Sequence, residues 1–411
     1  MAASELTFGP RILELADRLA VHSELPGALA CTYLTPAHRA TAQELAQWMR
    51  DAGMAVEIDG VANVVGRYAA AGPAKTVVVG SHYDTVVDAG KYDGRLGILT
   101  GLVVVEYLNR TGRRLPFAIE LIAFSEEEGV RYSASYIGST AVAGSFDDAL
   151  LARRDEAGVS LADAIAKSGF DPRAIPSLAC RREDLAGYLE VHIEQGPVLL
   201  EEGLPLGVVT AIAGGCRFVV TVSGQAGHAG TVPMGLRHDA AAAAAEIILA
   251  VERRCTGVPT LVGTVGKLQV PGGATNVIPG RCELSLDIRA ADNATRDAAV
   301  ADVRAEIAAI AQRRGVTIDV RETQRSGAVA CSPRVQALFG QAIGRLGIEP
   351  RFLPSGAGHD AVNFGPITET GMLFVRCGNG GVSHSPRETI TAEDADLGAR
   401  VLLDVLNSYQ V

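Results

Sequence analysis

Three apolar runs in this chain each end in histidine or acidic side chains. They are "KTVVVGSHYDT" (75–85), "FAIELIAFSEEEG" (117–129) and "GYLEVHIEQGPVL" (187–199). Apolar runs of this kind predict buried strands of a parallel sheet. A mostly apolar helical segment at 96–112 separates the first two runs, and strand–helix–strand order favours a mainly parallel sheet covered on both faces. Because open sheets of this type bind ligands at the ends of their strands, we expect the polar residues to gather there.

The pattern changes after residue 212. A strand, a helix, two strands, a helix and a final strand follow one another, which is the order of a ferredoxin-like α+β unit. The α/β pattern returns at residue 331, and 411 residues exceed what one ordinary core accommodates. We therefore predict an α/β fold in which a catalytic domain, 1–212 plus 331–411, is interrupted by a smaller domain at 213–330.

Composition narrows the possible partners and compartments. The net charge of −10 argues against nucleic acid as the main partner. The chain has no run of apolar residues long enough to predict a membrane span, and its start looks like a helix rather than a signal peptide. Its seven cysteines are widely spread without a C-x-x-C pair, which is typical of free thiols in a reducing compartment. We therefore expect a cytoplasmic protein with neither nucleic acid nor membrane as partner.

The polar residues that follow the predicted strands have the composition of a metal site. The candidates are His82, Asp93, Glu126, Glu127, Glu128, His192 and His384. Histidines combined with carboxylates suit a borderline divalent ion such as Zn²⁺, Mn²⁺ or Co²⁺. Asp84, two residues after His82, can accept the ring N–H of this histidine and fix its tautomer. The ligands are far apart along the chain, so their spacing alone fits ordinary polar loop residues equally well.

Seven motifs, taken in order, carry a more specific signal. They are "GSHYDTVVDAGKYDG", "FSEEEGVRY", "HIEQGPVL", "GHAGTVPMGLRHDA", "NVIPG", "SGAGHDA" and "GVSHSPRE", between positions 80 and 388. Together they resemble the amidase, hydantoinase and carbamoylase branch of the M20 metallopeptidase family, over nearly the whole chain. The resemblance implies a dinuclear-metal catalytic domain with a mainly parallel sheet, interrupted by a ferredoxin-like lid and dimerisation domain.

The same resemblance implies roles for individual residues at the metal site. Five residues match the metal ligands of the family: His82, Asp93, Glu128, His192 and His384. Asp93 matches the carboxylate that bridges two ions, and His82 and His384 match terminal ligands of different ions. Glu127 matches the general base, whereas Glu126 receives no role. The implied cofactors are two divalent ions per subunit, Mn²⁺ or Zn²⁺, with Co²⁺ or Ni²⁺ as further possibilities.

Other implied roles concern the substrate. His228 in "GHAGT" matches a donor to the developing oxyanion, which in relatives reaches the site of a neighbouring subunit, so the resemblance implies a homodimer and a closing motion. Arg289 and Asn276 match a clamp for the substrate carboxylate, and a guanidinium fork suits a carboxylate in a way that lysine does not. Arg217 matches a further anion-binding arginine of allantoate enzymes. Two more residues are expected to line the pocket: Gln195 and Gly358.

Local sequence favours one substrate within this branch. "FSEEEGVRY", "GHAGTVPM" and "FVRCGNGGVSHSP" look most like plant-type allantoate amidohydrolases, with Val130 and Val232 where many carbamoylases carry Ser and Thr. The expected partner is then a small ureido carboxylate, and the expected reaction converts allantoate to ureidoglycine, ammonia and CO₂. N-carbamoyl-L-amino acid hydrolase and β-ureidopropionase activities remain alternatives, because each of these substrates also carries one carboxylate and one ureido group.

Overall fold

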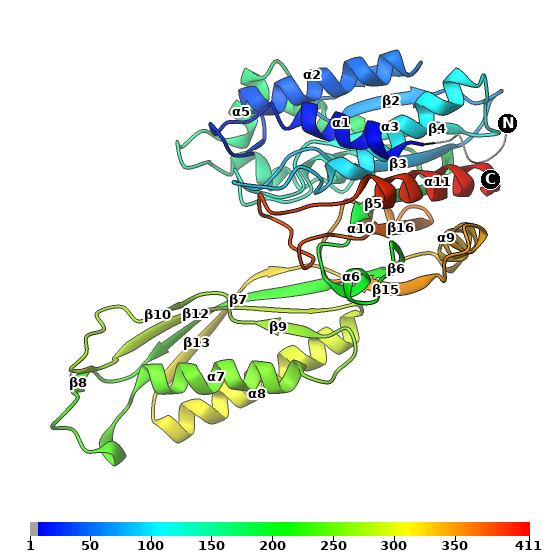
Figure 1. Cartoon of the computed structure of the whole chain (residues 1–411). Coiled ribbons are helices and arrows are strands. Elements are labelled where there is room, and N and C mark those ends of the chain that lie inside the picture. Colours follow the sequence, from blue (N-terminus) through cyan, green and yellow to red (C-terminus); the bar gives the residue numbers. More distant parts are fainter. Residues whose placement is uncertain (1–6) are drawn as a thin grey trace. The chain divides into compact units, whose positions relative to one another are not determined.

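The computed structural model describes residues 7–411 (Figure 1). These residues form two compact units. The first unit extends to Thr210 and also contains Cys331–Leu353 and His359–Val411, and the second contains Ala211–Ala330 and Pro354–Gly358. The segment Pro354–Gly358 was expected in the interrupted catalytic domain, whereas it packs with the second unit. That the two units act as a catalytic domain and a lid stays a prediction.

The first unit is built on a large sheet. Its strands are β1 (Ala55–Ile58), β2 (Val64–Tyr68), β3 (Thr76–His82), β4 (Ala118–Phe124), β5 (Leu185–Ile193), β6 (Leu206–Ile212) and β16 (Thr370–Val375), and β15 (Arg351–Ser355) also pairs with β6. The short strand β14 (Val329–Ala330) belongs to the second unit and pairs with Ala211 and Ile212, the end of β6 that lies in the same unit. The four central strands are parallel, in the order β4-β3-β5-β16. Antiparallel partners flank them, with β2 and β1 beyond β4 and β6 beyond β16. Every residue of β3 and of β16 is buried, as expected for interior strands without alternation.

Helices surround this sheet. They are α1 (Gly9–Leu19), α2 (Pro36–Asp51), α3 (Arg95–Arg110), α4 (Ile137–Ala143), α5 (Leu161–Lys167), α6 (Val198–Glu201), α9 (Pro333–Arg345), α10 (Ala361–Phe364) and α11 (Ala392–Ser408). The larger core joins apolar residues of α1, α2, α3, α9 and α11 to the central strands. A smaller cluster contains α4 and α5. Local capping fixes several helix starts, since the Thr35 hydroxyl accepts from His38 N and the Thr391 hydroxyl from Asp394 N.

The second unit combines an antiparallel sheet with two long helices. Its elements are β7 (Gly214–Ser223), β8 (Gly227–His228), α7 (Ala240–Cys255), β9 (Val262–Thr264), β10 (Leu268–Gln269), β11 (Val277–Ile278), β12 (Arg281–Ala290), α8 (Asn293–Arg314) and β13 (Thr317–Arg325). The sheet has the order β10-β12-β7-β13, with β9 also paired to β12, and β8 forms a separate ribbon with β11. Even-numbered residues of β7 and β12 are buried in a core shared with α7 and α8. Odd-numbered residues therefore face away from the helices.

These elements confirm the predicted α/β fold class. The first unit has a large sheet with a parallel centre, and the second unit has an antiparallel sheet that packs against two helices. Within residues 7–411, no helix has both the length and the apolar character needed to cross a membrane.

Candidate metal centre

The five predicted ligands meet at one edge of the parallel sheet. His82 ends β3, His192 is the penultimate residue of β5, and Glu128 follows β4. His384 lies in the loop after β16, and Asp93 lies just before α3. Parallel strands bring their carboxyl ends to the same edge, which explains how residues this distant in sequence become neighbours.

Asp93 joins two groups of side chains. Its Oδ1 lies 3.9 Å from His82 Nε2 and 3.3 Å from His192 Nε2. Its Oδ2 lies 3.1 Å from His384 Nε2, and that nitrogen lies 3.4 Å from Glu128 Oε1. In each group of three residues the possible ligand atoms lie within 4.8 Å of one another. One carboxylate shared between two such groups is the arrangement that a pair of bridged cations requires.

The hydrogen bonds of the two buried histidines fit a metal. Nδ1 of His82 lies 3.1 Å from the carbonyl oxygen of Asp84, and Nδ1 of His192 lies 2.9 Å from the carbonyl oxygen of Ile193. Because a carbonyl only accepts, each Nδ1 carries a proton. Burial lowers the pKa of His192 to about 4, so its neutral ring turns an unprotonated Nε2 toward Asp93. Burial opposes the charged form of His82 as well, but the nearby carboxylates raise the pKa of His82 well above its ordinary value, so this ring favours an added positive charge that a cation would replace. Asp93 Oδ1 is buried and receives no hydrogen bond from any residue of 7–411. Lone pairs facing one another in a buried site repel unless a cation lies between them, so this donor set suits a divalent metal.

The electrostatics of the site indicate the same need for positive charge. Burial raises the pKa of Glu128 to about 7, and the charge of Asp93 adds to this shift. Burial likewise raises the pKa of Glu127 well above its ordinary value. The hydrogen bond to Asp93 raises the pKa of His384 to about 9. The protein's own groups neutralise this cluster only by holding extra protons, and divalent cations would supply the missing charge.

Asp84 connects the end of β3 to the loop after β4. Its Oδ1 accepts from the backbone N–H of Glu127 at 3.0 Å, and its Oδ2 accepts from that of Glu128 at 3.1 Å. Its carboxylate was expected to accept the ring N–H of His82, but the distance is 3.5 Å, and the Asp84 carbonyl oxygen is nearer. The carboxylate is instead engaged by the two backbone donors. Asp84 thus fixes the backbone that carries both glutamates.

Gln195 lies beside the metal-ligand cluster. Its Nε2 donates to Asp93 Oδ2 at 2.9 Å and lies 3.4 Å from His384 Nε2. From the sequence, this residue was expected to line the substrate pocket. In the structure its amide contacts the Asp93 carboxylate, on the oxygen that faces His384, and its place in the substrate pocket stays a prediction.

Two residues near the ligands were not anticipated from the sequence. Glu388 Oε1 accepts from the backbone N–H groups of Tyr92 and Asp93 at 2.9 and 3.1 Å. The Ser383 hydroxyl lies 2.9 Å from Glu388 Oε2 and 3.2 Å from Asp93 Oδ2. Both residues belong to the motif "GVSHSPRE", which also contains His384. The presence of an acidic residue in the same motif as a metal ligand was the sequence feature that could have pointed to Glu388. Glu388 therefore ties the Asp93 loop to the loop that carries His384.

We expect Glu388→Gln to weaken metal binding about 10- to 100-fold. The glutamine oxygen takes the place of Oε1 and accepts from the two backbone N–H groups, which turns the NH₂ group toward Ser383. Because NH₂ only donates, the Ser383 hydroxyl gives its proton to Asp93 Oδ2 instead and competes with the cation. Calorimetric titration of metal-free protein with Mn²⁺ measures the effect. Glu393→Gln, which removes an exposed acid at the start of α11, is the matched control. Equal affinities in the two variants would contradict this role for Glu388.

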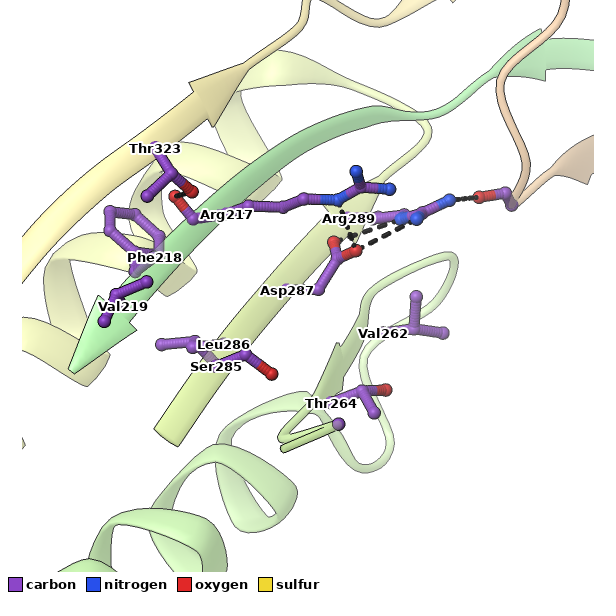
Figure 2. A pocket seen from close by; sticks show the side chains of 12 residues that line it. Arg217, Phe218, Val219, Val262, Thr264, Ser285, Leu286, Asp287, Arg289 and Thr323 are labelled. Atoms are coloured by element: carbon purple, nitrogen blue, oxygen red, sulfur yellow. Dashed lines mark hydrogen bonds and ion pairs between the residues drawn. The ribbon is translucent and has the colours of Figure 1, made fainter. Parts of the chain in front are cut away.

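The two predicted substrate arginines lie together on the face of the antiparallel sheet that carries the odd-numbered residues of β7 and β12 (Figure 2). Arg217 Nε and Arg289 Nη2 both donate to Asp287 Oδ2, at 3.0 and 2.9 Å. Both arginines line a cavity whose other walls are formed mainly by apolar and hydroxyl-bearing side chains. From the neighbouring loop it is Gly356 that lines this cavity, and its carbonyl oxygen accepts from Arg289 Nη1 at 2.9 Å. Gly358 is not among the residues that line this cavity, and its expected place in the substrate pocket stays a prediction.

His228 and Asn276 lie on the β8–β11 ribbon, away from the arginines. Val277 pairs with His228, and the Asn276 carbonyl accepts from Ala229 N at 2.9 Å. Arg289 lies opposite Gly215, eight residues before the end of β7, and the ribbon follows that end. A strand rises about 3.4 Å per residue, so the distance along the sheet is on the order of 25 Å. One chain therefore does not form a carboxylate clamp from Arg289 and Asn276 together.

Comparison with known proteins agrees with this geometry. The model of peptidase family M20/M25/M40 matches residues 78–408. An N-carbamoyl-L-amino acid amidohydrolase of Geobacillus stearothermophilus is 42% identical over 393 residues, covering 95% of each chain. Allantoate deiminase 1 of Glycine max is 39% identical over 404 residues, covering 90% of this chain and 83% of that one. The crystal structure of an amidase of the hydantoinase/carbamoylase family from Burkholderia multivorans matches with a TM-score of 0.92 and 33% identity, covering 99% of this chain and 98% of that one.

These matches confirm the resemblance read from the motifs. Proteins of this family depend on metal ions, in agreement with the ligand groups around Asp93. The chain is an enzyme, a hydrolase acting on carbon–nitrogen bonds other than peptide bonds. It belongs to peptidase family M20/M25/M40, in the branch of the hydantoinase/carbamoylase amidases.

Proposed function

We propose that this protein is a dinuclear-metal amidohydrolase that hydrolyses one ureido C–N bond of allantoate. The carbamate formed in this step then breaks down spontaneously with loss of CO₂, so that the products are ureidoglycine, ammonia and CO₂. The observation that carries the reaction class is Asp93, whose two oxygens face two separate groups of histidine and carboxylate ligands. Allantoate is favoured by the motifs around Val130 and Val232. The Geobacillus relative favours a second candidate, hydrolysis of N-carbamoyl-L-amino acids by the same mechanism.

Glu127 is the proposed general base. It is almost fully buried, belongs to a group with His82 and Glu128, and has a pKa raised well above its ordinary value by burial. Bound divalent cations would acidify a water molecule and polarise the ureido carbonyl. Glu127 takes one proton from the attacking water and delivers it to the nitrogen that leaves when the C–N bond breaks. Asp84 holds Glu127 in place through its backbone N–H.

His228 is the proposed donor to the oxyanion, acting from the partner subunit of a homodimer. Its Nδ1 accepts from Gly230 N at 3.0 Å, which leaves the proton of the neutral ring on Nε2 as a donor. The separation of His228 from Arg289 along the sheet supports a site shared between two chains. A donor positioned for the developing negative charge stabilises the transition state more than the substrate.

We expect His228→Ala to lower kcat by about 10²- to 10³-fold without changing metal affinity. His238→Ala, at another exposed histidine of the same unit, is the control and keeps its activity. Mixing His228→Ala subunits with Glu127→Gln subunits then tests whether His228 acts in the active site of the partner subunit. A heterodimer in which His228 acts across subunits has one complete site, so activity returns. If mixing restores nothing although heterodimers form, His228 does not act from the partner subunit.

Ammonia release from protein reconstituted with Mn²⁺ or Zn²⁺ tests the substrate. Allantoate, ureidoglycolate, N-carbamoyl-L-amino acids and N-carbamoyl-β-alanine are offered at equal concentrations. The proposal predicts the highest kcat/KM for allantoate. A higher value for an N-carbamoyl-L-amino acid would replace allantoate by the second candidate and leave the metal mechanism intact.

A further inference from the structure

The cavity in the second unit contains a carboxylate between two arginines (Figure 2). Asp287 Oδ1 accepts from Arg289 Nε at 3.0 Å and Oδ2 accepts from Arg289 Nη2 at 2.9 Å, so it engages one edge of this guanidinium bidentately. Asp287 Oδ2 also accepts from Arg217 Nε at 3.0 Å. Arg217 is fixed further by Gln324 Oε1, 2.9 Å from its Nη1. The aspartate therefore orients both arginines.

Strand register explains this grouping. Asp287 of β12 lies directly opposite Arg217 of β7, and Arg289 follows two residues later on the same face. Side chains directly opposite one another on antiparallel strands are neighbours, and so are residues two apart on one strand. The opposite face of the sheet is occupied by the core with α7 and α8, so the three charged residues share the face that carries the cavity.

The charge of this cavity is low for a site with two arginines. Arg217, Asp287 and Arg289 are the only charged residues among those that line it. Burial favours the neutral form of Asp287, but the hydrogen bonds and charges of Arg289 and Arg217 lower its pKa below its ordinary value. With Asp287 ionised, the cavity has a net charge of one positive unit.

We propose that Asp287 is a specificity-determining residue that restricts this pocket to substrates with a single carboxylate. The inference rests on the proposed function together with the roles that the sequence implies for Arg289 and Arg217, by which this pocket receives the carboxylate end of a ureido substrate. Asp287 already occupies a guanidinium edge that a carboxylate would use, and it cancels one of two positive charges. A second carboxylate on the substrate finds no unpaired positive charge and is repelled by Asp287. The pocket thus selects ureido monocarboxylates over ureido dicarboxylates.

Inhibition by simple anions tests this inference. Butyrate and succinate have the same number of carbon atoms but one and two carboxylates. Their inhibition constants are measured against ammonia release from the preferred substrate, and calorimetry gives their dissociation constants without turnover. Asp287→Asn raises the net charge of the pocket, so we expect the ratio of the succinate constant to the butyrate constant to fall about tenfold. Asp287→Glu keeps the charge and keeps the ratio near that of the wild type. Arg217→Gln lowers the net charge and raises the ratio.

The control is Asp302→Asn, which removes the same charge from an exposed ion pair with Arg254 outside the cavity. Its ratio stays at the wild-type value. A parallel rise of both constants in Asp287→Asn, with an unchanged ratio, would show a purely structural role and overturn the inference. An equal shift in Asp302→Asn would overturn it as well. If no ureido substrate releases ammonia, the proposed function fails, whereas the calorimetric ratio still decides the role of Asp287.

Discussion

Glu127→Gln is expected to lower kcat by about 10³-fold while the protein keeps its fold and its metal ions. Glutamine has nearly the shape of glutamate but cannot take a proton from water and return it to the leaving nitrogen. Glu127 is buried next to His82 and Glu128, where the change removes proton transfer without removing a bridging ligand. Steady-state ammonia release, together with metal content of the same sample, measures both effects.

The adjacent Glu126 provides the control for this substitution. It is fully buried, and burial raises its pKa well above the ordinary value, which favours its neutral form. Glu126→Gln makes the same change of side chain at the neighbouring position, which has no role in the proposed mechanism, so we expect kcat to stay largely unchanged. Near-normal turnover by Glu127→Gln would show that another group moves the proton.

Asp93→Asn is expected to abolish turnover by removing the bridge between the two metal ions. An amide offers one acceptor oxygen, so it can serve either the His82–His192 side or the His384–Glu128 side. Its NH₂ group would face imidazole or carboxylate ligands that the second ion needs. We expect at most one tightly bound ion per chain, measured by elemental analysis after dialysis against metal-free buffer.

Asp88→Asn is the matched control for Asp93→Asn. Asp88 is exposed in the same loop and has a φ of 58°, a left-handed conformation that asparagine also adopts readily. This variant loses the same charge and keeps both ions. Retention of two ions and of activity by Asp93→Asn would exclude Asp93 as the bridge.

Much of the metal centre follows from the sequence because parallel strands align their ends. Each of His82, Glu128 and His192 lies at or just after the end of an apolar run, and the sheet topology then brings them together. The motifs added Asp93 and His384, which lie in loops without a periodic pattern. Fold class was predictable for the same reason, since uninterrupted and alternating apolar runs separate the two kinds of sheet.

Residues that depend on tertiary register were not predictable. Asp287 reads as an ordinary charged residue in "LDIRA", and only its position opposite Arg217 shows that it joins two arginines. The same register separates Asn276 from Arg289, although both belong to one implied clamp. Glu388 acts through backbone N–H groups nearly three hundred positions earlier in the chain, and such a contact leaves no local pattern in the sequence.

The most direct test of the account is electron paramagnetic resonance of metal-free protein titrated with Mn²⁺. A carboxylate bridge holds two ions roughly 3.5–4 Å apart, close enough for their spins to couple. We expect that two equivalents of Mn²⁺ per chain bind and give the spectrum of a spin-coupled pair. A spectrum of isolated ions only, at any number of equivalents, would contradict a dinuclear centre bridged by Asp93.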